Sequence, residues 1–201
     1  MEIKWHTDTC FSIKAKKKTI VINPNREAGK LKGEMVLSSL ADPAEVEGVE
    51  RTFDWPGEYE MKNVPIVGMK AWIQKKSESE EEGGEGKSTT IFCFAVGKVK
   101  FCHLGELGHS LTSEMLERIG DVDVLMIKVG DKSHLDSKQA MEVIEAIEPR
   151  IVIPMGTDKV AEALKDIGAD KIEAIDSLEI KSRKDLPEEQ MNCVILNPSS
   201  S

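Results

Sequence analysis

The chain has 201 residues, of which 40% are hydrophobic and 31% charged. This composition predicts one soluble globular domain over residues 1–201 and excludes a disordered chain. The net charge of −9 argues against nucleic acid as the main partner, because phosphate binding needs a basic face. No apolar run approaches the ~20 residues of a membrane span, and the first residues contain no apolar signal segment, so we expect no membrane partner.

The four cysteines indicate a reducing compartment. No CxxC pair is present, and each cysteine lies in an apolar, strand-like run. We interpret them as reduced, buried thiols and expect a cytoplasmic protein. The residues concerned are Cys10, Cys93, Cys102 and Cys193.

The first part of the chain predicts short strands separated by polar turns. The strand candidates are Ile3–Trp5, Phe11–Ile13, Thr19–Ile22 and Met35–Leu37. After them, Asp42-Pro43 predicts the start of a short helix, with an acidic N-cap and proline at the first helical position.

A hairpin and a charged loop follow. Glu58–Met61 and Val64–Met69 flank Lys62-Asn63, which is typical of a two-residue hairpin turn. Residues 75–88 are acidic and of low complexity, so we expect a mobile, solvated hairpin loop. A loop of this kind is either a solvated tether, which we favour, or a segment that docks on a basic surface.

The rest of the chain alternates between strands and helices. The order of strands, then β-α-β-α, then strands predicts a layered α/β sandwich with helices packed outside the sheets. The expected strands are Thr89–Val96, Lys98–His103, Val122–Val129, Ile151–Pro154, Lys171–Ile175, Leu178–Lys181 and Met191–Leu196. The expected helices are Leu111–Ile119, Ser137–Ile147 capped by Asp136, and Asp158–Ile167 ended by Gly168.

Two common kinds of site find little support. Gly86-Lys87-Ser88 has the ending of a phosphate-binding P-loop, but Glu81 stands where the motif needs glycine, and a strand follows instead of a helix. The four histidines, His6, His103, His109 and His134, have no spacing that forms a local metal grip. Lone histidines are usually solvated or hydrogen-bonded to the backbone, although an assembly from distant segments stays open.

Two glycine-centred turns are more specific. One spans residues 55–60, and the other spans residues 103–112, where a strand ends in a glycine-flanked acid, Glu106, just before a helix. Such a turn brings backbone groups and a carboxylate to a sheet edge, where metal or anion sites often lie. The same turns could also persist because the backbone needs them, whatever the chemistry.

Taken in order, these segments resemble the metallo-β-lactamase superfamily, in its compact Zn-dependent hydrolase-like branch related to the L-ascorbate-6-phosphate lactonase group. Residues 3–11 resemble the opening I-x-W-x-G-H-S-C-F, and residues 19–24 resemble the next strand. Pro56–Glu60, His103–Gly108 and Glu148–Met155 match further turns and strands. The resemblance implies an αββα sandwich of two mixed sheets with helices outside, and a zinc centre that activates water.

The same resemblance places the family's metal ligands on residues of other types. The histidines of the early H-x-H-x-D-H motif fall on Ser39, Ala41 and Ala44, and its aspartate falls on Pro43, with Asp42 one residue away. The bridging aspartate falls on Glu106, the last histidine on Gly156, and the histidine of the opening motif on Asp8. The zinc ligands are therefore expected to be lost, and the remaining carboxylates suit only a weakly held divalent cation.

Two functions stay open at this point, because a shared fold does not carry activity. We expect a non-catalytic protein, a pseudoenzyme that binds a small ligand or a protein partner, or forms a homo-oligomer. The alternative is a metal-dependent hydrolase acting on a phosphoester, lactone or ester, with a rebuilt site in which His6, Asp8, Asp42 and Glu106 converge.

Overall fold

The computed structural model describes residues 1–16, 18–73, 87–130, 134–156, 164–166, 168–188 and 190–199. The predicted acidic loop over 75–88 therefore lies outside the described residues, apart from Lys87 and Ser88. The helix expected over 158–167 is described only at residues 164–166, which are helical. Within the described part of the chain, no helix has the length and apolar character needed to cross a membrane.

The first part of the chain forms a six-stranded mixed sheet in the order β14-β1-β2-β3-β5-β7. Its strands are β1 (Glu2–Thr7), β2 (Cys10–Ala15), β3 (Lys18–Ile22), β5 (Met35–Leu37), β7 (Arg51–Phe53) and β14 (Leu178–Glu179). The strands β3, β5 and β7 run parallel to one another, whereas the other pairs are antiparallel.

A seven-stranded mixed sheet has the order β15-β13-β12-β11-β10-β9-β8. Its strands are β8 (Gly57–Met61), β9 (Val64–Trp72), β10 (Ser88–Val96), β11 (Val99–His103), β12 (Val124–Lys128), β13 (Ile151–Met155) and β15 (Asn192–Cys193). The four strands from β11 to β15 are parallel, and β8 to β11 form antiparallel hairpins. Ser88 begins β10, which confirms the prediction that a strand and not a helix follows Gly86-Lys87-Ser88.

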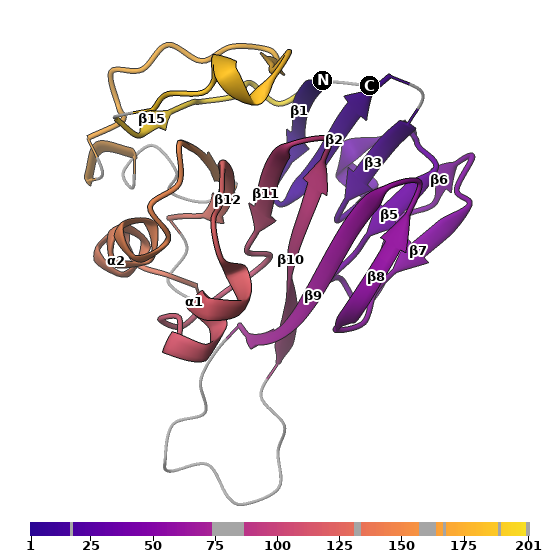
Figure 1. The fold of residues 1–201 in the computed structure, drawn as a ribbon, viewed down its shortest axis with the longest axis horizontal. Helices are drawn as coiled ribbons and strands as arrows, with labels where there is room; N and C mark the ends of the chain where they lie inside the picture. The colour runs from indigo at the N-terminus through magenta and orange to yellow at the C-terminus, as the bar shows by residue number, and fades with distance from the viewer. Residues whose placement is uncertain are drawn as a thin grey trace, which may run out of the picture.

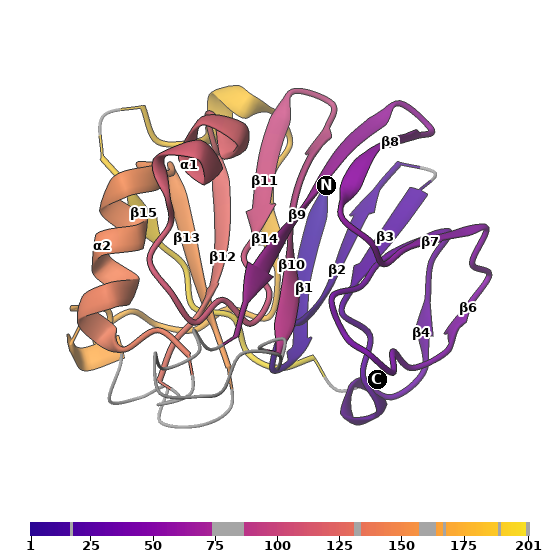
Figure 2. The same cartoon turned by 90° about the horizontal axis from the view of Figure 1, so that it is seen from below.

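The two sheets face each other, as the resemblance implied (Figure 1). The core between them is aliphatic and aromatic, with Phe11, Phe92 and Phe101 fully buried. Helices α1 (Ser113–Ile119) and α2 (Ser137–Ile147) pack outside the seven-stranded sheet through a second apolar cluster (Figure 2). The outer side of the six-stranded sheet is covered by a smaller cluster that includes the turn η1 (Arg26–Ala28) and the strands β4 (Leu31–Lys32) and β6 (Val46–Glu47).

Most predicted strands and both described helices are confirmed, because their apolar patterns match the faces that they bury. At the hairpin between β8 and β9, Lys62 and Asn63 both have positive φ, as a tight two-residue turn requires. Helix α1 begins two residues later than predicted, after Thr112, whose side chain accepts a hydrogen bond from Met115 N. Every residue of β12 is buried, as its continuous apolar run indicated.

The helix predicted at Asp42-Pro43 is wrong. The Asp42 carboxylate forms an exposed ion pair with Arg26, 3.0 Å away, instead of capping a helix. The backbone N–H of Ala44 donates to Pro24 O, so this segment bonds across to a neighbouring loop and not to itself.

Near the C-terminus, two further predictions fail. Lys171–Ile175 forms no strand; only Ile175 makes an isolated bridge, to Leu196. The strands β14 and β15 are two residues long each, shorter than predicted. These segments lie at the sheet edges, where few neighbours extend the pairing.

All four cysteines are free thiols, as predicted, but they are not all buried. Cys10 and Cys102 are fully buried, whereas Cys93 and Cys193 are partly exposed. The apolar runs correctly indicated strands but not which face of each strand was covered.

Helix α2 should depend measurably on its N-terminal capping box. The Asp136 carboxylate accepts from Gln139 N, and the Gln139 side chain accepts from Asp136 N. Because Asp136→Ala leaves the backbone N–H of Gln139 to water, we expect a loss of about 1 kcal/mol in the free energy of unfolding, measured in urea. The matched control is Lys138→Ala, which removes only a long, exposed ion pair with Glu142 and should change stability little. Equal losses in the two variants would contradict the capping role.

Candidate functional site

The candidate site lies at the edge where the parallel strands of both sheets end. The turn between β1 and β2 carries Asp8 and Thr9, and Asp8 adopts a left-handed conformation with φ of 47°. The side chain of Asn23, just after β3, donates to Thr9 Oγ1. From the other sheet, the His103 ring bonds to Thr9 O at 3.0 Å. The ends of strands from both sheets therefore meet at this turn.

Lys128 is the last residue of β12 and lies on the inner face of its sheet. Side chains alternate along a strand, and Val124 and Met126 belong to the core between the sheets. Lys128 continues this face to the rim of the sandwich, where its side chain is only 9% exposed. A buried ammonium needs charged partners, because an unpaired buried charge is strongly unfavourable.

Two carboxylates from different parts of the fold provide those partners. Lys128 Nζ lies 2.9 Å from Asp8 Oδ1 and 3.3 Å from Glu106 Oε1. The contact with Asp8 is the shorter of these two ion pairs. Burial acts to lower the pKa of Lys128, but the charges and contacts of Asp8 and Glu106 outweigh it and raise that pKa.

His134, in the loop after β12, approaches the same carboxylate. Its Nε2 lies 3.5 Å from Glu106 Oε1, and its side chain is 5% exposed. The contact with His134 is the largest cause that lowers the pKa of Glu106 to about 2; burial opposes it and Lys128 adds to it. Glu106 is therefore a carboxylate at all ordinary pH values, held by a lysine and a histidine.

His103 joins the ends of β11 and the β1–β2 turn as a neutral ring. Its Nδ1 accepts from Gly105 N at 3.1 Å, which assigns the ring proton to Nε2, the atom that donates to Thr9 O. Complete burial lowers the pKa of His103 to about 4, and the two backbone contacts only partly oppose this effect. The ring is therefore neutral at ordinary pH values. It links Gly105 N to Thr9 O, and we call this bridge the His103 clasp.

Ser39, which the resemblance places at a ligand position, is hydrogen-bonded to Asn23. Ser39 N donates to Asn23 Oδ1 at 2.8 Å, and Asn23 Nδ2 donates to Ser39 Oγ at 3.0 Å. The hydroxyl also lies 3.2 Å from where a Cβ on Gly105 would stand. Gly105 has φ of 60° and packs against Thr89, so a side chain there would be both strained and obstructed.

The other predicted positions do not join this cluster. Ala41 and Asp42 are exposed, and Pro43 and Ala44 lie in the same loop without a donor side chain. Gly156 is buried at the end of β13 and offers backbone only. The structure thus brings Asp8 and Glu106 together through Lys128 but leaves Asp42 paired with Arg26 on the surface.

The four histidines are separated as well. The His6 ring bonds to Ser12 Oγ at 2.9 Å on the outer face of the six-stranded sheet, and burial lowers the pKa of His6. His109 accepts from Trp72 N and contacts Ser110 O, which fits the backbone role expected of a lone histidine. Only His134 comes near the two carboxylates.

The residues at the family's metal centre do not fit a zinc ion. Zinc sites use three or four nitrogen, sulfur or carboxylate donors. Within the ranges that the structure describes, no group of three histidine, cysteine, aspartate or glutamate side chains could hold a metal ion. The space between Asp8 and Glu106 is instead taken by the Lys128 ammonium.

Sequence reasoning overlooked Lys128 and did not single out His134 for this site. The sequence did contain an indication that Lys128 is buried. It is the one charged residue in the apolar run from Val124 to Val129, and the alternation of side chains places it on the same strand face as Val124 and Met126. A lysine at such a position needs carboxylate partners, because an unpaired buried charge is strongly unfavourable. The identity of these carboxylates depends on loops that meet only in the folded chain.

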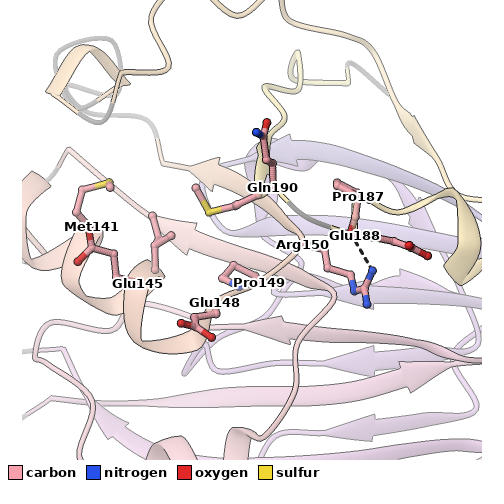
Figure 3. A pocket seen from close by; sticks show the side chains of 10 residues that line it. Met141, Glu145, Glu148, Pro149, Arg150, Pro187, Glu188 and Gln190 are labelled. Carbon is pink, nitrogen blue, oxygen red and sulfur yellow. Dashed lines mark hydrogen bonds between the residues drawn. The ribbon is translucent and has the colours of Figure 1, made fainter.

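A separate cavity lies at the opposite edge of the seven-stranded sheet, beside the start of β13 (Figure 3). It has a volume of about 560 Å³ and lies between α2 and the segment containing Pro187 and Met191. Arg150 at its margin donates to Pro187 O and pairs with Asp123, which is 1% exposed. Arg183 also pairs with Asp123. This buried carboxylate is therefore held by two arginines, and we assign it a structural role.

Comparison with known proteins agrees with the fold and the sequence pattern. Residues 2–156 match the family described as the Beta-lactamase superfamily domain. A UPF0173 protein of Pyrococcus abyssi is 24% identical over 178 residues, covering 77% of this chain and 82% of the relative. A UPF0173 metal-dependent hydrolase of Carboxydothermus hydrogenoformans is 31% identical over 64 residues, covering 32% of this chain and 28% of the relative.

Solved structures give the same result. A Thermotoga maritima crystal structure, described as a Zn-dependent hydrolase of the metallo-β-lactamase superfamily, superposes with a TM-score of 0.78 at 28% identity; the match covers 98% of this chain and 100% of that one. Igni18 of Ignicoccus hospitalis, described as a metallo hydrolase, has a TM-score of 0.60 at 14% identity and shares the fold; 90% of this chain and 99% of that one are covered.

The chain belongs to the metallo-β-lactamase superfamily. Within it, the relatives named above carry the description UPF0173. The resemblance inferred from the motifs is thereby confirmed.

The neutral His103 clasp should make stability depend on pH. A histidine in the unfolded chain titrates near 6.5, whereas His103 in the fold titrates at about 4. Between these values the unfolded state binds more protons, so the free energy of unfolding falls as pH falls, by about 3 kcal/mol in total. We expect His103→Gln to flatten this part of the profile in urea unfolding, while the two profiles stay parallel above pH 7. Equal slopes below pH 6.5 would contradict the clasp.

Proposed function

We propose that this protein is a non-catalytic, metal-independent member of its superfamily that acts by binding. The proposal depends on one observation: the Lys128 ammonium lies within ion-pair distance of Asp8 and Glu106, at the place where relatives named as metal-dependent hydrolases would hold their ion. A positive charge is still supplied there, but by a side chain. An ammonium has no empty orbital for a water or a carbonyl oxygen, so it cannot replace the Lewis-acid chemistry of a metal.

The charges of the cluster support this interpretation. One ammonium and two carboxylates leave a net negative charge, and His134 contacts one of these carboxylates, Glu106. A divalent cation entering the same space would meet the repulsion of Lys128. Ser39, which stands at a ligand position, is already occupied by its hydrogen bonds with Asn23. Both effects disfavour zinc.

The rival function is hydrolysis by a rebuilt metal site, and the names of the relatives favour it. On that reading Lys128 would move aside, and Asp8 and Glu106 would bind a cation together with water. Carboxylate oxygens without imidazole suit magnesium, calcium or manganese better than zinc. The two functions differ in what removal of Lys128 should do.

Substitution of Lys128 distinguishes them. In Lys128→Ala, Asp8 and Glu106 lose their counter-charge, and we expect a loss of about 3 kcal/mol in the free energy of unfolding. The vacated space should then accept Mn²⁺ at roughly millimolar concentration, which water-proton relaxation would detect, while the wild type should not bind it. The matched control is Lys100→Ala, which removes an exposed ion pair with Asp121 and should do neither.

Elemental analysis and activity assays complete the comparison. We expect the purified wild-type protein to contain far less than one zinc per chain and to show no chelator-sensitive hydrolysis of phosphoesters, lactones or esters. One tightly held metal ion per wild-type chain would overturn the proposal. So would equal Mn²⁺ affinity in the wild type and in Lys128→Ala.

A binding role needs a surface, and the cavity beside α2 supplies one. Its apolar lining includes Met141, Ile144 and Met191. Glu145, Glu148 and Glu188 also line it (Figure 3). Arg150 is committed to Asp123 and to Pro187 O, so it does not neutralise this rim. The volume of about 560 Å³ lies in the range of small-molecule sites. The chemistry favours a ligand with an apolar body and a cationic end.

A pair of probes of equal size tests this preference. Hexylammonium should shift the NMR signals of the Met141 and Met191 methyl groups at roughly millimolar concentration, whereas hexanoate should leave them unchanged, because the rim repels a carboxylate. The methyl group of Met155, fully buried between the sheets, is the internal control. The double variant Glu145→Gln, Glu148→Gln should lose the discrimination. Equal shifts with both probes would contradict a charge-selective site.

A further inference from the structure

Two cysteines stand directly opposite each other on neighbouring strands. Cys93 of β10 pairs with Cys102 of β11 in the antiparallel register, and their Sγ atoms are 3.5 Å apart. Both side chains lie on the sheet face that carries the helices. Neither takes part in the Lys128 cluster, so the site assigned above leaves this pair unexplained.

The position of the pair in the hairpin suits a disulfide bond. Val96 and Val99 flank the two-residue turn, and such flanking residues exchange both backbone hydrogen bonds. Because hydrogen-bonded and non-hydrogen-bonded pairs alternate, Cys93 and Cys102 form a non-hydrogen-bonded pair. The Cα spacing of such pairs is about 4.5 Å, within the range that a disulfide spans. A small rotation of both side chains would therefore close the bond without moving the strands far.

Only one of the two thiols is open to a reagent. Cys102 is fully buried, whereas Cys93 is partly exposed and lines a groove of about 220 Å³ beside the end of α1. Lys100, Arg118 and Asp121 line the same groove, where Lys100 pairs with Asp121. The remaining positive charge of Arg118 favours an anionic reagent that carries its own sulfur.

We propose that Cys93 and Cys102 form a thiol–disulfide exchange site that takes an acidic low-molecular-weight disulfide, of which glutathione disulfide is the type. The Cys93 thiolate attacks one sulfur of the reagent, which breaks the S–S bond and releases one thiolate. The Cys102 thiol then gives its proton to the released thiolate, and its sulfur attacks Cys93 and expels the second thiolate, which takes a proton from solvent. Two protein thiols are oxidised, and one disulfide is reduced to two thiols.

The order of the two steps follows from burial. Contact with Cys93 and burial raise the pKa of Cys102, so Cys102 is the poorer first nucleophile. It becomes effective only once Cys93 holds a leaving group 3.5 Å away. The other cysteines lack this arrangement: burial raises the pKa of Cys10 to about 12 and that of Cys193 to about 11. Cys193 is partly exposed as well and is therefore the matched single thiol.

The location links this bond to the fold of the site. Cys102 directly precedes His103, whose ring holds the β1–β2 turn through Thr9 O. A covalent link between β10 and β11 at this point constrains the strand end that carries the clasp. Oxidation and reduction would then change how firmly the two sheets are joined at that edge.

Glutathione disulfide and the full-length protein provide the test. After incubation, mass spectrometry under non-reducing conditions should show a loss of two hydrogens, and peptide mapping should join Cys93 to Cys102. Titration of free thiols should fall from four to two, with Cys10 and Cys193 still free. Dithiothreitol should restore all four. In Cys102→Ala a stable glutathione adduct should remain on Cys93, and in Cys93→Ser the adduct and the link should both be absent.

The outcomes that overturn the proposal are distinct. A persistent glutathione adduct on Cys93 of the wild type would show that Cys102 does not complete the exchange. Modification of Cys193 before Cys93 would show that the groove gives no selectivity. If cystamine, a cationic disulfide, oxidised the pair as fast as glutathione disulfide at low ionic strength, the assignment to an acidic reagent would be wrong.

Discussion

The ammonium of Lys128 holds together two carboxylates that belong to different sheets. Asp8 comes from a turn of the six-stranded sheet, and Glu106 follows β11 of the seven-stranded sheet. Removal of one partner from such a buried group leaves a charge without compensation, which costs about 3 to 5 kcal/mol. The interaction therefore links the two sheets at the edge of the sandwich.

Neutral hydrogen bonds surround this charged centre and connect the loops to one another. His103 connects the end of β11 to Thr9, and Asn23 connects the end of β3 to both Thr9 and Ser39. Buried polar groups that are fully paired in this way define one arrangement of the loops.

Local patterns predicted the elements well where one face was continuously buried. The strand β12, the helix α2 with its capping box, and the turn at Lys62-Asn63 follow from apolar periodicity and from the residues that favour caps and tight turns. The helix predicted to begin at Asp42 does not form. The Asp42 carboxylate instead pairs with Arg26, which is distant in sequence. The short C-terminal strands failed because pairing at a sheet edge depends on which neighbours the fold provides.

The sequence by itself determined the superfamily and the two-sheet core, since both depend on residue types at ordered positions. Only the tertiary structure decided which side chains meet at the candidate site. The meeting of Lys128 with Asp8 and Glu106, and of Cys93 with Cys102, joins residues that are far apart in the chain or opposite in a hairpin. The physical reason is that the interaction of a charged group or a thiol with its partner depends on a separation of a few ångström. Strand register and loop packing set that separation.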